Sequence, residues 1–284
     1  MKPRKVAIIA DTALDVPVDF AKEYDVFLLP ISVIFSDGEY RDQIDISTEE
    51  VYRRLHEEIP KTSLPSGEMI LRTFDAVAAK GYEEALFFTL SSGMSGTYNM
   101  LHLMAQEETR FQSFVFDTKN IGLGGGFFAM HAAVLAKEGH DLASIKAQVC
   151  DTTKKSKQFG KFKNFEFLEK GGRIGLVTAK IGTLLNIKPI ISVNDDGIVY
   201  TAAKVKGNKK ARKEMVELLS QFLEGHEHFC LSVQQGEAEE EASIMIDLLE
   251  ERFPGKPLLE GHIGTAFGVH TGPGMIVIGA YIYK

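Results

Sequence analysis

Short apolar runs alternate with helix-like segments over the first 150 residues, and this alternation limits the folds that the chain can adopt. Continuous apolar runs of this length are typical of strands that are covered on both faces of a sheet. Because strands that alternate with helices form parallel sheets, this half predicts a doubly wound α/β fold. The expected strands cover 5–10, 26–35, 85–90 and 113–118, and the expected helices cover 18–23, 47–56, 67–79, 98–105, 122–137 and 141–155.

The second half of the chain has a different pattern. Two β-rich runs flank Asn194-Asp195-Asp196-Gly197, a turn sequence that is typical of an antiparallel hairpin. This half therefore predicts an α+β fold with a mixed sheet. A chain of 284 residues is long for one layered unit, so we expect an N-terminal α/β (Rossmann-like) domain over 1–155 and a C-terminal α+β domain over 156–284. The expected strands here cover 187–193, 198–203, 228–234 and 275–283, and the expected helices cover 180–185, 209–224 and 237–252.

Composition and charge exclude several classes of protein. The formal net charge is −7 and basic residues are scattered among acidic ones, whereas a nucleic-acid-binding protein presents a basic face. No window holds the roughly 18 apolar residues of a membrane-spanning helix, and the first apolar stretch is too short for a signal peptide. Cys150 and Cys230 have no metal-ligand spacing. We expect a cytoplasmic protein with no cofactor, no metal site and no stable membrane insertion.

Two short segments are rich in hydroxyl side chains. Thr62-Ser63-Leu64-Pro65-Ser66-Gly67 and Ser91-Ser92-Gly93-Met94-Ser95-Gly96-Thr97 are called the first and second hydroxyl segments. The second one lies where an expected strand leads into an expected helix, and free N–H groups at a helix start bind carboxylates and phosphates. Helix capping explains one or two of the hydroxyls in each segment, but not all of them. We therefore expect a small anionic ligand.

Two other patterns follow expected strands, at the edge of the sheet where open α/β folds place their ligands. Asp11 and Asp15 come directly after the first strand, and they fit either a ligand site or the capping of a turn or helix. A glycine run begins at Gly122, but Phe127 stands at the last glycine position of the G-x-G-x-x-G fingerprint. This run indicates close packing or close approach to a ligand rather than nucleotide binding.

The segment around Ser95 also resembles the nucleophile elbow of serine hydrolases, although its second glycine stands one position early. Such an enzyme needs a histidine, and His270 lies in the glycine-rich stretch 268–274, where it fits a ligand contact or a structural hydrogen bond. Arg173 fits an anion or a carboxylate at a domain interface. A serine-dependent acyl hydrolase that uses Ser95 and His270 is therefore the alternative function.

Taken together, the motifs resemble those of the DegV family, the fatty-acid-binding proteins of bacteria. The resemblance extends over nearly the whole chain, in order and spacing. Thr12, Ala13 and Met94 stand where the family usually has Ser, Thr and Leu, which bears on the hydrogen bonding of the first motif. The matching motifs are Asp11-Thr12-x-x-Asp15-Val16-Pro17, Thr62-Ser63-x-Pro65-Ser66, Ser91-Ser92-Gly93-x-Ser95-Gly96-Thr97-Tyr98, Leu168-Glu169-x-Gly171-Gly172-Arg173-Ile174, Leu185-Asn186-Ile187-Lys188-Pro189-Ile190 and Gly268-x-His270-Thr271-Gly272-Pro273-Gly274.

The resemblance implies a two-domain protein that binds one long-chain fatty acid, of the palmitate or oleate class, in an apolar tunnel between the domains. It also implies that the chain has no catalytic residue of its own. Some relatives are acyl-carrying subunits of bacterial fatty acid kinase, so the implied partner is an ATP-dependent kinase that phosphorylates the bound carboxylate. The implied carboxylate contacts are Thr62 or Ser63 and Ser95, completed by Ser92, Gly96, Thr97, Arg173 and His270. The candidate tunnel residues, chosen because they lie near the loops of these motifs, are Phe127, Phe128, Ile181, Leu184 and Phe267.

Overall fold

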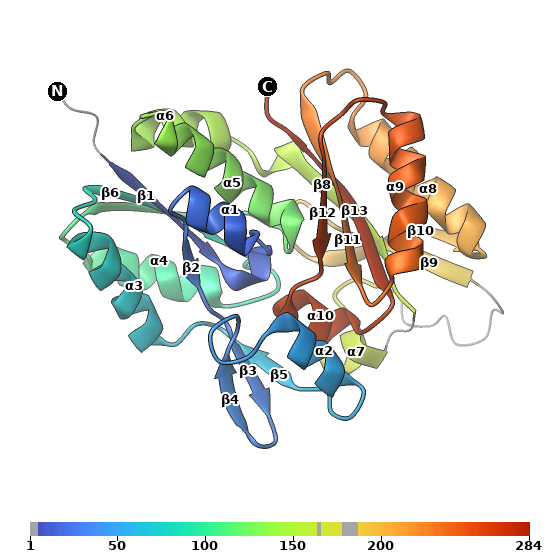
Figure 1. Cartoon of the computed structure of the whole chain (residues 1–284), viewed down its shortest axis with the longest axis horizontal. Helices are drawn as coiled ribbons and strands as arrows, with labels where there is room; N and C mark the ends of the chain where they lie inside the picture. Colours follow the sequence, from blue (N-terminus) through green and yellow to red (C-terminus); the bar gives the residue numbers. More distant parts are fainter. Residues whose placement is uncertain (1–4, 164–165, 178–186) are drawn as a thin grey trace.

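The N-terminal half is built on a four-stranded sheet (Figure 1). The structure is a computed structural model, and it describes residues 5–163, 166–177 and 187–284. The strands lie in the order β2 (Phe27–Leu29), β1 (Val6–Asp11), β6 (Glu84–Thr89) and β7 (Gln112–Asp117), and each neighbouring pair is parallel. The helices of this half are α1 (Val18–Glu23), α3 (Gly67–Ala79), α4 (Thr97–Glu107), α5 (Leu123–Lys137) and α6 (Leu142–Val149).

Alternate residues of these strands face two different apolar layers. In β1, Ile8 and Ala10 belong to the layer formed with α5 and α6, while Ala7 and Ile9 belong to the layer formed with α3 and α4. The two helix pairs lie on opposite faces of the sheet (Figure 1). Every residue of β1 is buried, which explains its continuous apolar sequence. The predicted doubly wound fold is confirmed.

The C-terminal half is built on a six-stranded mixed sheet. The β11–β12 pair is parallel and the other neighbours are antiparallel, including the predicted hairpin of β9 and β10. Helices α8 (Asn208–Phe222) and α9 (Glu239–Arg252) cover one face, where they pack against Ile276 and Ile278. The strands lie in the order β10 (Val199–Lys206), β9 (Ile187–Val193), β8 (Ser156–Lys161), β13 (Met275–Ile282), β11 (Phe229–Gly236) and β12 (Leu258–His262).

The other face of this sheet joins the two halves. Tyr281 of β13 stacks on Phe127 of α5, with ring centroids 5.8 Å apart. Met275 and Val277 belong to the same apolar cluster as the α5 face of the N-terminal sheet. A continuous core therefore connects the two sheets. The domain boundary at residue 155 stays a prediction; β8, the first strand of the six-stranded sheet along the chain, begins one residue later.

A third sheet, which is antiparallel, lies beside the junction of the two halves (Figure 1). Val33, Tyr52 and Val269 pack together in the apolar cluster beside this sheet. No helix of the described ranges is long and apolar enough to cross a membrane. The elements of this region are β3 (Ser32–Phe35), β4 (Gly38–Arg41), β5 (Lys61–Ser63), α2 (Thr48–Leu55), α7 (Glu166–Lys170) and α10 (Thr265–Thr271).

Three expected elements differ from the structure or lie outside it. The extended run expected at 26–35 is two strands in two sheets, because Pro30 has no N–H to donate to a ladder. The helix expected at 141–155 ends with α6, and the 3₁₀ turn η2 (Thr153–Lys155) follows it. The helix expected at 180–185 lies outside the described residues.

Other elements were missed because their sequences do not show what the tertiary structure buries. β8 is polar, yet most of it is buried at the centre of its sheet. Its Ser156 hydroxyl donates to the carbonyl of Gly124 at 2.6 Å, so its polar side chain is satisfied. The loop expected at 268–274 is helical over its first part, because α10 extends to Thr271. Gly272, with a φ of 70°, ends this helix. The elements β4, β5, α7 and β12 were also missed.

Candidate functional site

A cavity of about 180 Å³ lies where the three sheets meet. One side of it is polar and comes from the two hydroxyl segments, α10 and the chain after α7. The remaining walls are apolar. The polar lining side chains are Thr62, Ser63, Ser95, Arg173, His270 and Thr271, and the apolar ones include Ala13, Ile31, Leu90, Leu168, Ile191, Val199 and Phe267.

Asp11 positions the start of the second hydroxyl segment. Leu90 is the last residue before that segment, and its N–H donates to Asp11 Oδ2 at 2.8 Å. Asp11 Oδ1 accepts the N–H of Ala13 at 3.1 Å and so caps the 3₁₀ turn η1 (Thr12–Leu14). Of the two roles considered for Asp11, the structure shows capping. Burial raises the pKa of Asp11 to about 7.

The hydroxyls of the second segment have separate tasks. Ser91 donates to the carbonyl of Gly197 at 2.7 Å and so fixes the segment to the β9–β10 hairpin. Ser92 accepts a hydrogen bond from Lys119 Nζ at 2.8 Å. Ser95 lines the cavity, and its hydroxyl lies 2.9 Å from that of Thr97. One hydroxyl of this segment therefore reaches the cavity while its neighbours hold the segment in place.

The first hydroxyl segment is divided in the same way. Thr62 and Ser63 belong to β5, which pairs with β3, and both line the cavity. Ser66 accepts the N–H of Met69 at 3.2 Å and caps α3. Capping thus explains one hydroxyl here, as the sequence suggested, and pairing in the sheet places the other two at the site.

His270 lies on the α10 wall of the cavity and is neutral. Its Nε2 is 2.9 Å from the Thr62 hydroxyl, whereas its buried Nδ1 has no hydrogen-bond partner. Burial, reinforced by the charge of Arg173, lowers the pKa of His270 to about 4. Because an unpaired buried acceptor costs less than an unpaired N–H, the bonding pattern fits a proton on Nε2 that is donated to Thr62. The Thr62 hydroxyl is then free to donate into the cavity.

Two neighbours restrict the position of His270. A Cβ on Gly171 would overlap its Nδ1, so the backbone after α7 packs directly on the ring. Arg173 Nη1 donates to the carbonyl of Gly171 at 2.8 Å, and Arg173 Nε donates to the carbonyl of Met94 at 3.4 Å. Among the described residues that line the cavity there is no carboxylate, so the charge of Arg173 is not neutralised there. The polar side of the cavity is therefore suited to an anion.

A second, smaller cavity lies against the apolar side of the first. This space of about 20 Å³ shares Ile121, Ile191, Val199 and Phe267 with the main cavity. It continues toward Met275, at the junction of the two halves. The main cavity thus has a polar side that includes Arg173, and it shares part of its apolar wall with a small space in the protein core.

Six of the eight predicted site residues line the cavity, namely Thr62, Ser63, Ser95, Gly96, Arg173 and His270. Ser92 and Thr97 are not among the lining residues; they bond to Lys119 and Ser95 respectively. Of the predicted tunnel residues Phe267 lines both cavities, Phe127 and Phe128 pack on Tyr281, and Ile181 and Leu184 lie outside the described residues. Thr271 was missed as a site residue, although it stands in the motif that contains His270.

The geometry also bears on the enzyme alternatives. Ser95 bonds to Thr97 and His270 bonds to Thr62, so the structure shows no hydrogen bond between the proposed nucleophile and base. In the glycine run, a Cβ on Gly126 would overlap the carbonyl of Leu14, which confirms close packing. Among the described residues no group of three or more His, Cys, Asp or Glu side chains is arranged to hold a metal ion.

Comparison with known proteins agrees with this architecture. The family model described as an uncharacterised protein of the DegV family matches residues 5–282. A DegV domain-containing protein of Clostridium acetobutylicum is 37% identical over 280 residues, which cover 99% of both chains. The crystal structure of DegV from Bacillus subtilis, described as a fatty acid binding protein, has a TM-score of 0.89 and 25% identity and covers 98% of this chain and 99% of that one.

A second structure, described as showing fatty acid binding of a DegV family protein from Thermus thermophilus, has a TM-score of 0.89 and 29% identity. The match covers 98% of this chain and 99% of the Thermus chain. Both structural matches reproduce the parallel N-terminal sheet and the mixed C-terminal sheet together. This chain belongs to the DegV family.

Proposed function

We propose that this chain binds a long-chain fatty acid, with the carboxylate on the polar side of the cavity and the acyl tail along its apolar side. The observation that carries this proposal is the position of Arg173, a cation with no carboxylate beside it in the described lining, on the polar side of a cavity whose remaining walls are apolar. Thr62, Ser63 and Ser95 supply neutral hydroxyl donors around the same point. The relatives from Bacillus and Thermus that are described as fatty acid binding support the same ligand class.

The acyl tail and the carboxylate of the ligand contribute to binding in different ways. Each buried methylene contributes roughly 0.8 kcal/mol, so a palmitate or oleate tail supplies most of the affinity. The polar side chains fix the direction of the ligand, because a carboxylate in the apolar part would be left without donors. The smaller cavity behind Phe267 and Val199 marks the path proposed for the tail.

We further propose that the bound fatty acid is presented to a separate ATP-dependent fatty acid kinase in the cytoplasm. Several neutral hydroxyls beside Arg173 share the carboxylate, and donors of this kind leave one of its oxygens able to attack a phosphoryl group. The hydroxyl of Ser95 bonds to Thr97 and not to His270, so Ser95 is not paired with a base. The proposed role of the chain is that of a substrate-carrying subunit, and the test is ATP-dependent formation of acyl phosphate from the loaded protein plus a kinase.

Native mass spectrometry tests the binding proposal directly. Protein purified from a bacterial host, or incubated with palmitate or oleate, is expected to carry one adduct of fatty-acid mass. Ser95→Ala is expected to weaken binding about tenfold through loss of a hydrogen bond to a charged group. Ser92→Ala is the matched control, because the Ser92 hydroxyl bonds to Lys119. The absence of any adduct, with no uptake of added acid, would refute the proposal, and equal affinities of the two variants would refute the placement of the carboxylate.

The hydrolase alternative is separated by covalent labelling. An acyl hydrolase that uses Ser95 reacts with a fluorophosphonate probe, because its serine is activated by an adjacent base. With His270 bonded to Thr62, we expect no label on Ser95. Stoichiometric labelling that is lost in Ser95→Ala would instead establish the hydrolase.

A further inference from the structure

The part of the smaller cavity that is separate from the main one is formed by three adjacent strands, β8, β9 and β13. A volume of about 20 Å³ has room for about one water molecule. An acyl tail that follows the proposed path to this point therefore needs one of the lining side chains to move. The described residues that line the smaller cavity but not the main one are Gln158, Gly160, Ser192, Val193, Met275 and Val277.

The polar members of this set are held in place by hydrogen bonds. Gln158 Nε2 donates to Asn120 Oδ1 at 2.7 Å and to the carbonyl of Ile121 at 2.9 Å. The Ser192 hydroxyl donates to the carbonyl of Gln158 at 2.7 Å. Displacing either side chain would leave a buried polar group without its partner, which is costly. Val193 and Val277 are β-branched, so their χ1 angles are restricted.

Met275 is the member of this set that can move. Its unbranched side chain has three rotatable bonds and no strong hydrogen-bonding group, so it adapts to irregular spaces. It is fully buried, and its methyl group lies over Gly160, because a Cβ on Gly160 would overlap Met275 Cε. Gly160 pairs with Val277 on one side and with Ile191 on the other. A glycine inside a strand marks a close approach by another group, which here is the end of Met275.

We propose that Met275 determines the length of the acyl chain that this site accepts. Its side chain lies over Gly160 and closes the proposed tail path between β8 and β13. A tail that reaches this point contacts the Met275 methyl group, and further methylenes fit only as far as that side chain can turn aside. The inference rests on the proposed function, because it concerns the tail of the ligand proposed there.

Displacement of a fluorescent fatty acid measures the affinities for laurate, myristate, palmitate, stearate and arachidate. The length limit is the last acid of this series whose added methylenes still raise the affinity. Met275→Ala removes three heavy atoms from the end of the path and is expected to move the limit about one acid toward arachidate. At that acid the gain over the preceding one is expected to be about tenfold larger than in the wild type, as for two more buried methylenes.

Gly160→Ala is expected to have the opposite effect. Its methyl group occupies the place of the Met275 methyl, and Val277 Cγ2 lies 3.2 Å from the same position, so Met275 is pushed into the path. The length limit is expected to move about one acid toward laurate. In Gly160→Ala/Met275→Ala the new methyl group meets no methionine, so the limit is expected to equal or exceed that of the wild type. This dependence of one substitution on the other distinguishes a direct contact from a general loosening of the core.

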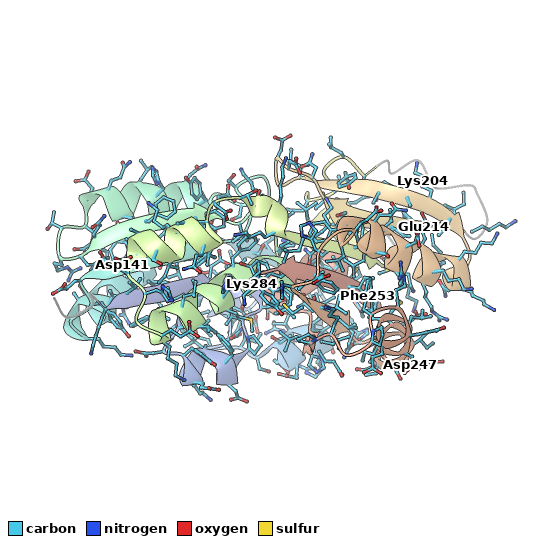
Figure 2. All side chains as sticks on the ribbon, turned by 90° about the horizontal axis from the view of Figure 1, so that it is seen from above. Asp141, Lys204, Glu214, Asp247, Phe253 and Lys284 are labelled. Carbon is cyan, nitrogen blue, oxygen red and sulfur yellow. The ribbon has the colours of Figure 1, made fainter. Side chains whose placement is uncertain are left out.

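Met245→Ala is the matched control. Met245 is equally buried, but it lies in the apolar layer under α8 and α9, on the opposite face of the six-stranded sheet. These two helices are labelled at Glu214 and Asp247 in Figure 2. Met245→Ala is expected to lower the free energy of unfolding and to keep the length limit of the wild type.

Equal length limits in all these proteins, with palmitate still bound, would overturn the proposal. Failure of every acid to bind the wild type would instead refute the proposed function, and the inference with it. If Met275→Ala does not fold, Met275→Val replaces it. Its side chain is too short to lie over Gly160, so a shift of the length limit in the same direction is expected.

Methyl NMR of isotope-labelled methionine tests the contact independently of affinity. The Met275 signal is identified by its absence in Met275→Val, and Gly160→Ala is expected to shift it in the ligand-free protein. In the wild type, bound stearate is expected to shift this signal more than bound laurate does, whereas neither acid moves the Met245 signal. Equal shifts with the two acids, or no shift with stearate bound, would overturn the proposal.

Discussion

Replacing Thr62 by valine tests the proton arrangement at the head of the site. Valine has nearly the shape of threonine and removes the hydroxyl that lies 2.9 Å from His270 Nε2. In the empty protein the buried His270 N–H is left without an acceptor, which costs about 1–3 kcal/mol of unfolding free energy. In the complex the carboxylate loses one charge-assisted hydrogen bond, worth about 1.5–3 kcal/mol, so the affinity is expected to fall roughly 10- to 150-fold.

Displacement of a fluorescent fatty acid measures the affinity, and urea unfolding of the empty protein measures the stability. Thr62→Ser keeps the hydroxyl and is the matched control, with an affinity expected within about threefold of the wild type. Nitrogen NMR of His270 is expected to show a proton on Nε2 in the wild type. If Thr62→Val binds palmitate as tightly as Thr62→Ser, the Thr62 hydroxyl does not hold the carboxylate.

Three further predictions follow from the same site. Because the pKa of His270 is lowered to about 4 in the folded state, the stability that its neutral form contributes is present above pH 6.5 and is lost as the pH falls. In urea unfolding, the free energy of unfolding of His270→Gln is expected to fall by about 2–3 kcal/mol less than that of the wild type between pH 7 and pH 4.5. Parallel curves for the two proteins would contradict this. Gly171→Ala places a Cβ against His270 and is expected to cost about 1–3 kcal/mol, whereas Gly67→Ala, whose Cβ meets Met100 at an ordinary 3.6 Å, is its control in thermal unfolding. Val199→Phe narrows the passage between the two cavities and is expected to weaken palmitate binding more than octanoate binding by calorimetry; an equal loss for both acids would show that the tail takes another path.

The sequence patterns were most informative where a local rule dominates. The continuous apolar run of β1 and the glycines of α5 predicted a strand covered on both faces and a closely packed helix start, and both are confirmed. The turn at 194–197 predicted the β9–β10 hairpin, because its composition alone favours a reversal of the chain. Ser66 caps α3, and it is one of the hydroxyls that helix capping was expected to explain.

Long-range contacts explain what the patterns missed. β8 has a polar sequence, and its burial depends on partners such as Gly124, which is 32 residues away in the chain. Four residues of α10 line the cavity, namely Ala266, Phe267, His270 and Thr271, yet its glycines made this segment resemble a loop. No local pattern distinguishes a glycine that ends a helix from one that continues a loop, because the difference lies in what packs around it.

By itself, the sequence determined the two kinds of sheet, the concentration of hydroxyl groups in two segments and the motifs that mark the family. It did so because strand periodicity, turn composition and capping depend on neighbours along the chain. Only the tertiary structure decided which hydroxyls face the cavity, that Ser92 bonds to Lys119 instead, and that His270 is held neutral by burial beside Arg173. It also buried the Asp42 carboxyl group completely, with neither of its oxygens hydrogen-bonded. Burial and hydrogen-bond partners across such distances are properties of packing, and they decide the charge and direction of each group at this site.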